Sequence, residues 1–218
     1  EEIQNKIDLS NTYFEKCEVA GPGFINFFLK SDFYADILLD VDALGDNYGR
    51  SDSGNGKKIN VEFVSANPTG PMHMGNARGG ALGDCLAAVL EWAGYEVSRE
   101  FYVNDAGNQI DKFGLSLDVR YQQLLLGEEI IELPEDSYHG EDIKVRAQEF
   151  IDVYGDKYLK ETEEVRRKAL VEFALPKNIA TMKAAMAKYR IDYNTWFSEL
   201  TLHNGGELKE TIDILTKN

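Results

Sequence analysis

The chain has 218 residues, of which 43% are hydrophobic and 28% charged, values typical of a globular protein and not of a disordered or collagenous one. Its 23 basic and 38 acidic residues give a formal net charge of −15. This excludes a protein that coats nucleic acid with its whole surface, because the affinity for nucleic acid comes mainly from neutralising phosphates with basic side chains. No apolar run approaches the roughly 18 residues of a membrane span, and Cys17 and Cys85 show no CxxC spacing. We therefore expect a cytoplasmic protein with no membrane partner and no zinc.

Residues 1–45 are predicted to form a small, partial α+β domain. The segment 24–30 follows a Gly-Pro-Gly turn and is dense in apolar side chains, which predicts a strand. Ser31 or Asp32 is expected to cap a helix whose apolar residues recur at the helical period, and Gly45 stands where that helix would end.

The segment 46–58 is rich in Gly, Ser and Asn, so it is either a linker between domains or a long surface loop. After it, the residue pattern predicts a strand at 59–65, a helix at about 75–92 and a strand at 97–103. A strand, a helix and a strand within this length form a βαβ unit with parallel strands. The side chains predicted to be buried on the helix are Leu82, Leu86, Val89, Leu90 and Ala93.

The remainder of the chain is predicted to be mostly helical. An amphipathic helix is expected at 109–126, and residues 135–195 read as a helical insertion that Pro176 interrupts. Leu208, Ile212 and Leu215 mark a last short helix. The fold class is therefore α/β, with residues 59–218 forming an unfinished parallel sheet with a helical insertion.

The segment from Ser65 to Gly80 carries the most informative pattern, SANPTGPMHMGNARGG. It lies at the carboxyl end of the first strand of the unit, where open α/β sheets bind ligands. It leads into a helix N-terminus, whose free N–H groups favour phosphate. His73 and Asn76 lie three residues apart, so both project near that terminus, and Gly75 removes a side chain there. A nucleotide triphosphate site is predicted, although the P-loop pattern GxxxxGK[ST] and the dinucleotide pattern GxGxxG are both missing from the sequence.

These residues resemble a known family. The tetrapeptide His73-Met74-Gly75-Asn76, after SANPTGP, is similar to the first signature of class I aminoacyl-tRNA synthetases. The wider runs VEFVSANPTGPMHMGNARGGALGD and EVSREFYVNDAGNQI are similar to bacterial arginyl-tRNA synthetases, and the resemblance covers almost the whole chain. It implies a Rossmann-like catalytic domain preceded by an N-terminal appended domain.

The resemblance also implies a function and the residues that perform it. ATP, with Mg²⁺, would activate arginine, and the arginyl group would pass to tRNA(Arg). His73, Gly75 and Asn76 would bind ATP, with His73 and Asn76 acting in catalysis. The residues expected to bind arginine are Ser65, Ala66, Asn67 and Asn76. We expect a monomer.

Two departures from the family pattern limit this expectation. Asn76 stands where the family often has a second histidine, and an amide donates a hydrogen bond but cannot become cationic. The lysine-rich second signature is not found in these residues, so we expect an N-terminal fragment that is inactive alone. A non-catalytic tRNA-binding module of the same fold and a nucleotidylyltransferase remain alternatives.

Overall fold

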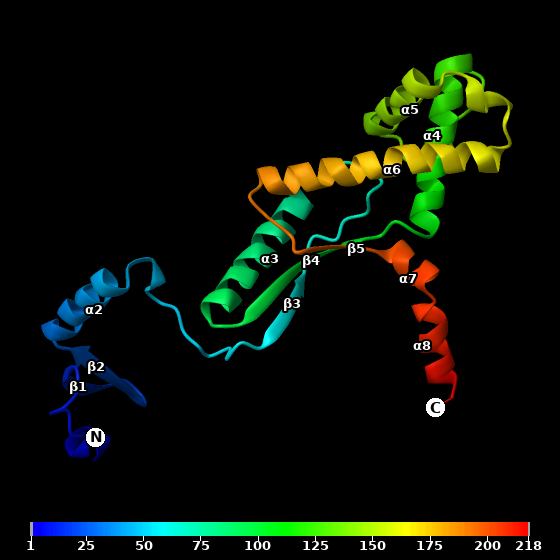
Figure 1. Cartoon of the computed structure of the whole chain (residues 1–218). Coiled ribbons are helices and arrows are strands. Elements are labelled where there is room, and N and C mark those ends of the chain that lie inside the picture. Colours follow the sequence, from blue (N-terminus) through cyan, green and yellow to red (C-terminus); the bar gives the residue numbers. More distant parts are fainter. Residues whose placement is uncertain (1, 218) are drawn as a thin grey trace. The chain divides into compact units, whose positions relative to one another are not determined.

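The computed structural model describes residues 2–217, and its internal contacts divide the chain into two compact units, Glu1–Ser51 and Asp52–Asn218 (Figure 1). The division falls inside the segment 46–58 that the sequence predicts to be a linker. The predicted domain bounds, 1–45 and 59–218 with a linker between them, remain a prediction. No helix within residues 2–217 is long and apolar enough to cross a bilayer.

The first unit is an antiparallel hairpin followed by a helix. Its elements are α1 (Glu2–Lys6), β1 (Phe14–Ala20), β2 (Phe24–Leu29), α2 (Ser31–Leu44) and the short 3-10 helix η1 (Gly45–Asn47). The predicted strand and helix are confirmed, and β1 is an element that the sequence reading missed. Gly45 ends α2 with a φ of +51°, as expected of a glycine at that position. The predicted cap is wrong: Lys30 takes the N-cap position, and no side chain caps the helix.

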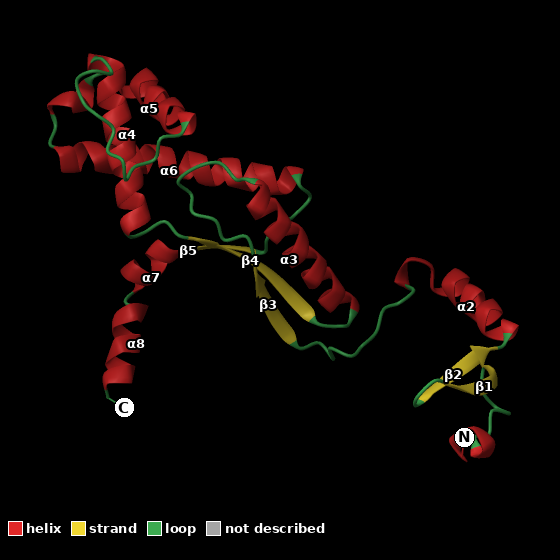
Figure 2. Cartoon of the chain, turned by 180° about the vertical axis from the view of Figure 1, so that it is seen from behind, coloured by secondary structure: helices red, strands yellow, loops and turns green. Residues whose placement is uncertain are grey.

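The second unit is built on a three-stranded parallel sheet in the order β3-β4-β5 (Figure 2). Its first βαβ unit consists of β3, α3 and β4 as predicted, although β3 ends three residues before the expected position. The elements of the second unit are β3 (Lys58–Glu62), α3 (Met74–Trp92), β4 (Glu96–Val103), α4 (Asn108–Leu126), α5 (Glu141–Tyr154), η2 (Lys157–Lys160), α6 (Glu163–Lys188), β5 (Thr195–Ser198), α7 (Glu199–Gly205) and α8 (Glu207–Thr216).

The helical insertion lies between β4 and β5, and α6 joins it to the sheet. The first half of α6 contributes Leu170 and Ala174 to a core shared with α4 and α5. Its second half contributes Met182 and Met186 to the two clusters that pack on the strands. A helix of 26 residues is about 39 Å long, so one rigid element connects both cores (Figure 1).

Pro176 does not interrupt the helical pattern, contrary to the sequence prediction. The helix α6 continues through it from Glu163 to Lys188. A proline inside a helix costs about 3 kcal/mol. Buried residues on both sides, Ala174 and Asn178, hold the two halves in place, so tertiary packing offsets this cost.

The buried face of α3 is also different from the predicted one. Leu82 is 74% exposed, Leu86 50% and Val89 65%, whereas the residues buried on this helix are Gly80, Gly83 and Ala87. A Cβ added to Gly83 would lie 2.2 Å from the Cγ of Phe63 at the end of β3. The helix therefore approaches the sheet through its smallest residues, while Leu82, Leu86 and Val89 are exposed. Of the five residues predicted to be buried, Leu90 and Ala93 are half-buried.

Candidate active site

The predicted site lies where the chain leaves β3 and enters α3. Val64 and Ser65 both adopt positive φ values, +68° and +41°, which turn the chain away from the strand direction. Such a conformation is strained for a β-branched residue and costs about 1–3 kcal/mol. The hydroxyl of Ser65 accepts a hydrogen bond from the Tyr102 N–H of β4 at 3.1 Å, and the Ser65 N–H donates to the Phe63 carbonyl at 3.0 Å. These bonds hold the turn in place.

His73 and Asn76 together cap the N-terminus of α3. The Nδ1 atom of His73 accepts a hydrogen bond from the Gly75 N–H at 3.1 Å, and the Oδ1 atom of Asn76 accepts one from the His73 N–H at 3.0 Å. Because Nδ1 acts as an acceptor, the neutral ring carries its proton on Nε2, which is then a donor. A Cβ on Gly75 would lie 2.9 Å from the His73 ring, so a larger residue there would displace the imidazole from its position over the helix end.

A pocket of about 620 Å³ opens beside this helix end. It brings together five of the six predicted site residues, and Gly75 lies behind His73 outside the lining. The lining residues are Val64, Ser65, Ala66, Asn67, Thr69, Gly70, Pro71, Met72, His73, Asn76, Tyr138, Gly140 and Asp142. Asn67 and His73 are exposed, whereas Ser65, Ala66 and Asn76 are half-buried. The pocket thus combines a helix N-terminus and the side-chain donors of Asn67, His73 and Asn76 with one carboxylate, Asp142. A helix N-terminus with nearby donors suits phosphate.

Tyr138 and Asp142 line this pocket, and the sequence reading did not include them. They belong to the helical insertion, where the loop before α5 is tied to α4. The Tyr138 N–H donates to the Ser116 hydroxyl at 2.9 Å, and its own hydroxyl donates to Gln109. No local signal marked them, because a carboxylate in the first turn of a helix is expected for helix stability alone.

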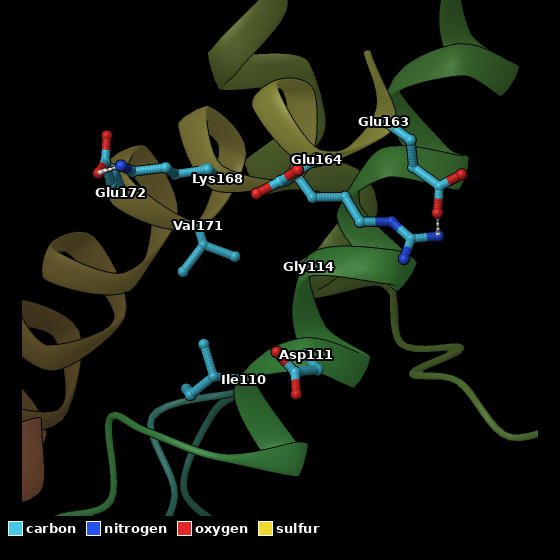
Figure 3. Close-up of a pocket in the computed structure, with 9 residues that line it drawn as sticks. Ile110, Asp111, Gly114, Glu163, Glu164, Lys168, Val171 and Glu172 are labelled. Atoms are coloured by element: carbon cyan, nitrogen blue, oxygen red, sulfur yellow. Dashed lines mark ion pairs between the residues drawn. The ribbon is translucent and has the colours of Figure 1, made fainter.

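A second groove, also of about 620 Å³, lies between α4 and α6 (Figure 3). Two apolar residues, Ile110 and Val171, face it together with charged residues of both signs (Figure 3). Arg167 forms an ion pair with Glu163 at 2.5 Å, and Lys168 lies 4.0 Å from Glu172. Four carboxylates line the groove against two cationic side chains, so it repels a triphosphate.

In the basic cluster Arg166-Arg167-Lys168, only Lys168 is exposed to solvent, and Arg167 is half-buried. Arg166 is buried and forms a two-bond ion pair with Asp118 of α4, with one of the bonds 3.1 Å long. This hydrogen bond to Asp118 is the main reason that the pKa of Arg166 is raised. The first residue of the cluster therefore joins two helices rather than facing solvent.

Asp105 lies just after β4 and caps the start of α7. One carboxylate oxygen accepts a hydrogen bond from the Ser198 hydroxyl at 2.6 Å, and the other accepts one from the Leu200 N–H at 2.9 Å. It thus secures the start of α7, while Gly107 precedes α4 without a side-chain cap. His139 and His203 are exposed. Within residues 2–217 no group of three or more His, Cys, Asp or Glu side chains is arranged to hold a metal ion.

Comparison with known proteins identifies the class to which this fold and pocket belong. Residues 40–200 match the family model of the class I tRNA synthetase (R) catalytic domain, so the chain belongs to that family. The particular branch is the arginyl one, because residues 1–29 also match the arginyl-tRNA synthetase N-terminal domain.

Individual relatives agree with this assignment. The chain is 57% identical to the arginine–tRNA ligase of Acetivibrio thermocellus over 213 residues, which are 98% of the chain and 38% of the relative. It is 58% identical to that of Caldanaerobacter subterraneus over 215 residues, with shares of 99% and 38%. A crystal structure described as a putative arginyl-tRNA synthetase from Campylobacter jejuni is 31% identical, with a TM-score of 0.73, over 87% of this chain and 40% of that one. The chain therefore spans about two fifths of the length of the curated relatives it matches.

Proposed function

We propose that this chain contributes part of the active site of an enzyme that activates arginine with ATP and transfers it to tRNA(Arg). The family supports the reaction class, and the pocket beside α3 supports the location. The observation that carries the proposal is the capped N-terminus of α3, where His73 and Asn76 face a pocket that also contains Asn67. A helix N-terminus attracts phosphate, and the reaction needs positioning and charge stabilisation more than covalent catalysis.

The positions of the site residues support the following roles. The Nε2–H of His73 would donate to the α-phosphate as charge builds during the attack of the arginine carboxylate. The NH₂ group of Asn76, whose oxygen is occupied by the helix cap, would donate to ribose or phosphate. Asn67 would hold the amino or carboxylate end of arginine, and Ser65 and Ala66 would line its pocket.

Mg²⁺ is the ion expected to accompany ATP. Mg²⁺ in nucleotide sites is usually held by one or two carboxylates together with phosphate oxygens. Asp142 supplies a carboxylate among the described lining residues, so the residues present fit this ion. The ion would neutralise charge on the phosphates, while His73 and Asn76 orient them.

The setting we propose is the cytoplasm, with the protein as a monomer. Both cysteines, Cys17 and Cys85, are free thiols, in keeping with a reducing compartment.

The test is arginine-dependent exchange of pyrophosphate into ATP by the full-length protein. His73→Ala is expected to lower the rate by about 10²–10³, the usual effect of removing one pre-positioned donor. Gly79→Ala is the matched control on the same helix, since a Cβ there meets nothing within 4 Å. A wild-type rate in His73→Ala would refute the role of His73. Exchange without any amino acid would identify a nucleotidylyltransferase instead.

A further inference from the structure

The buried side-chain amide of Asn178, in the helical insertion, is hydrogen-bonded to the loop that contains the residues predicted to bind arginine. Asn178, on α6, is only 7% exposed, and its Nδ2 atom donates a hydrogen bond to the Pro68 carbonyl at 2.9 Å. Its Oδ1 atom accepts one from the Nε of Arg146, on α5, at 2.8 Å. Pro68 directly follows Asn67 in the sequence. Two residues that are 110 positions apart are therefore joined beside the pocket.

The chemistry of the three groups fixes the orientation of this amide. A guanidinium only donates hydrogen bonds, and a carbonyl only accepts them. The Asn178 oxygen must therefore face Arg146 and its nitrogen must face Pro68. Since Pro68 is fully buried, leaving its carbonyl without a donor would carry a desolvation penalty of about 1–3 kcal/mol.

Arg146 is itself held by side chains of two helices. Its Nη1 atom donates to both carboxylate oxygens of Glu149, at 3.0 and 2.9 Å, and its Nη2 atom donates to the Thr181 hydroxyl at 3.1 Å. Lys177 donates to the same carboxylate at 2.9 Å, and this bond is the main reason that the pKa of Glu149 is lowered. A donor that is charged and fixed in this way polarises the Asn178 amide and strengthens its bond to Pro68.

We propose that Asn178 is a positioning residue for amino-acid activation: it holds the Pro68 carbonyl and so sets the place of Asn67 and of the loop leading to His73. It does not line the active-site pocket, and it acts through the loop. The long helix α6, seated in both cores, gives this bond a rigid base. The inference rests on the proposed function for its effect on catalysis, but the bond itself can be tested without it.

Three variants of the full-length protein test the role in catalysis. Asn178→Ala removes both hydrogen bonds, and Asn178→Asp keeps the acceptor for Arg146 while losing the donor to Pro68. Thr181→Ala is the matched control, because it removes one contact of Arg146 on the same helix and leaves the loop bond intact. A displacement of about 1 Å at a reacting group can reduce a rate about 100-fold. We expect both Asn178 variants to lower kcat/KM for arginine by about 10- to 100-fold, with a raised KM for arginine.

The stability of the same variants separates positioning from a merely structural role. Asn178→Asp gains an ion pair with Arg146, which offsets the penalty of a Pro68 carbonyl left without a donor. Its unfolding midpoint is therefore expected to stay near that of the wild type while its kcat/KM falls. If kcat/KM for arginine falls in proportion to the unfolding midpoint across the three variants, the proposal is overturned. It is also overturned if the Asn178 variants have the same kcat/KM as Thr181→Ala. A wild-type protein without arginine-dependent exchange would refute the proposed function instead.

Amide hydrogen exchange tests the bond in the 218-residue chain, whatever its activity. In Asn178→Ala the amides of residues 65–67, 69 and 70 are expected to exchange faster than in the wild type, while those of the α4 core around Phe113 and Leu117 keep their rates. Unchanged exchange in the loop, or faster exchange throughout the insertion, would contradict a positioning role.

Discussion

Replacing Gly83 by alanine is predicted to destabilise the second unit, although alanine is the better helix former. The Cβ would lie 2.2 Å from Cγ and 2.4 Å from Cβ of Phe63, atoms that cannot move without the β3 backbone. Overpacking of this kind costs about 1–3 kcal/mol. Because Phe63 would have to move by more than about 1 Å to reach van der Waals distance, we take a cost of about 3 kcal/mol. The higher helix propensity of alanine offsets about 1 kcal/mol of it. The net loss is therefore about 2 kcal/mol.

Gly79→Ala provides the matched comparison one turn earlier on α3. Because a Cβ there meets nothing within 4 Å, only the propensity gain remains, and we expect a stabilisation of up to about 1 kcal/mol. Urea unfolding followed by tryptophan fluorescence reports on the second unit alone, since both tryptophans, Trp92 and Trp196, lie in it. The two variants should differ by about 3 kcal/mol, a factor of about 100 in the folding equilibrium. If Gly83→Ala proves as stable as Gly79→Ala, α3 does not rest on Phe63.

Two further predictions concern buried polar groups of the second unit. Asp118→Ala leaves the Arg166 guanidinium buried without its carboxylate, so the free energy of unfolding should fall by about 3–5 kcal/mol; the exposed Asp111→Ala on the same helix is the control, and equal stability of the two would contradict this account. Burial raises the pKa of the Tyr193 phenol, whose hydroxyl donates to the Phe63 carbonyl. Because the folded pKa lies above the unfolded value of about 10, the stability that this phenol contributes is complete below pH 10 and is lost as the pH rises further. Tyr193→Phe should be less sensitive to alkali in a pH series of unfolding curves, and identical profiles would refute this assignment.

The strongest sequence predictions concern segments whose signal is local. The amphipathic pattern at 109–126 and the glycine-bounded helix at 75–92 were each placed within one residue of the observed α4 and α3. The motif around His73 can also be recognised from the sequence, because a strand end, a turn and a helix N-terminus follow one another directly in the chain.

Wrong predictions arise where tertiary packing overrides local preference. The periodicity of α3 favours its leucines as the buried face, but a helix that lies close to a parallel sheet buries glycines instead. The four residues of β5 are too few for a period to be detected, so only pairing with β4 defines that strand. Asp142 and Asn178 reach the pocket region through the fold of the insertion, and no spacing in the sequence links them to Asn67.

The central claim is that the N-terminus of α3 receives the phosphates of ATP. The most direct measurement is a titration of the ¹⁵N-labelled chain with a non-hydrolysable ATP analogue, followed through its backbone amide resonances. We predict shifts at Gly75, Asn76 and Ala77, with none at Gly114 or Val171 in the acidic groove between α4 and α6. Shifts confined to that groove, or unchanged amide resonances at the N-terminus of α3 at a saturating concentration of the analogue, would contradict the proposed phosphate site.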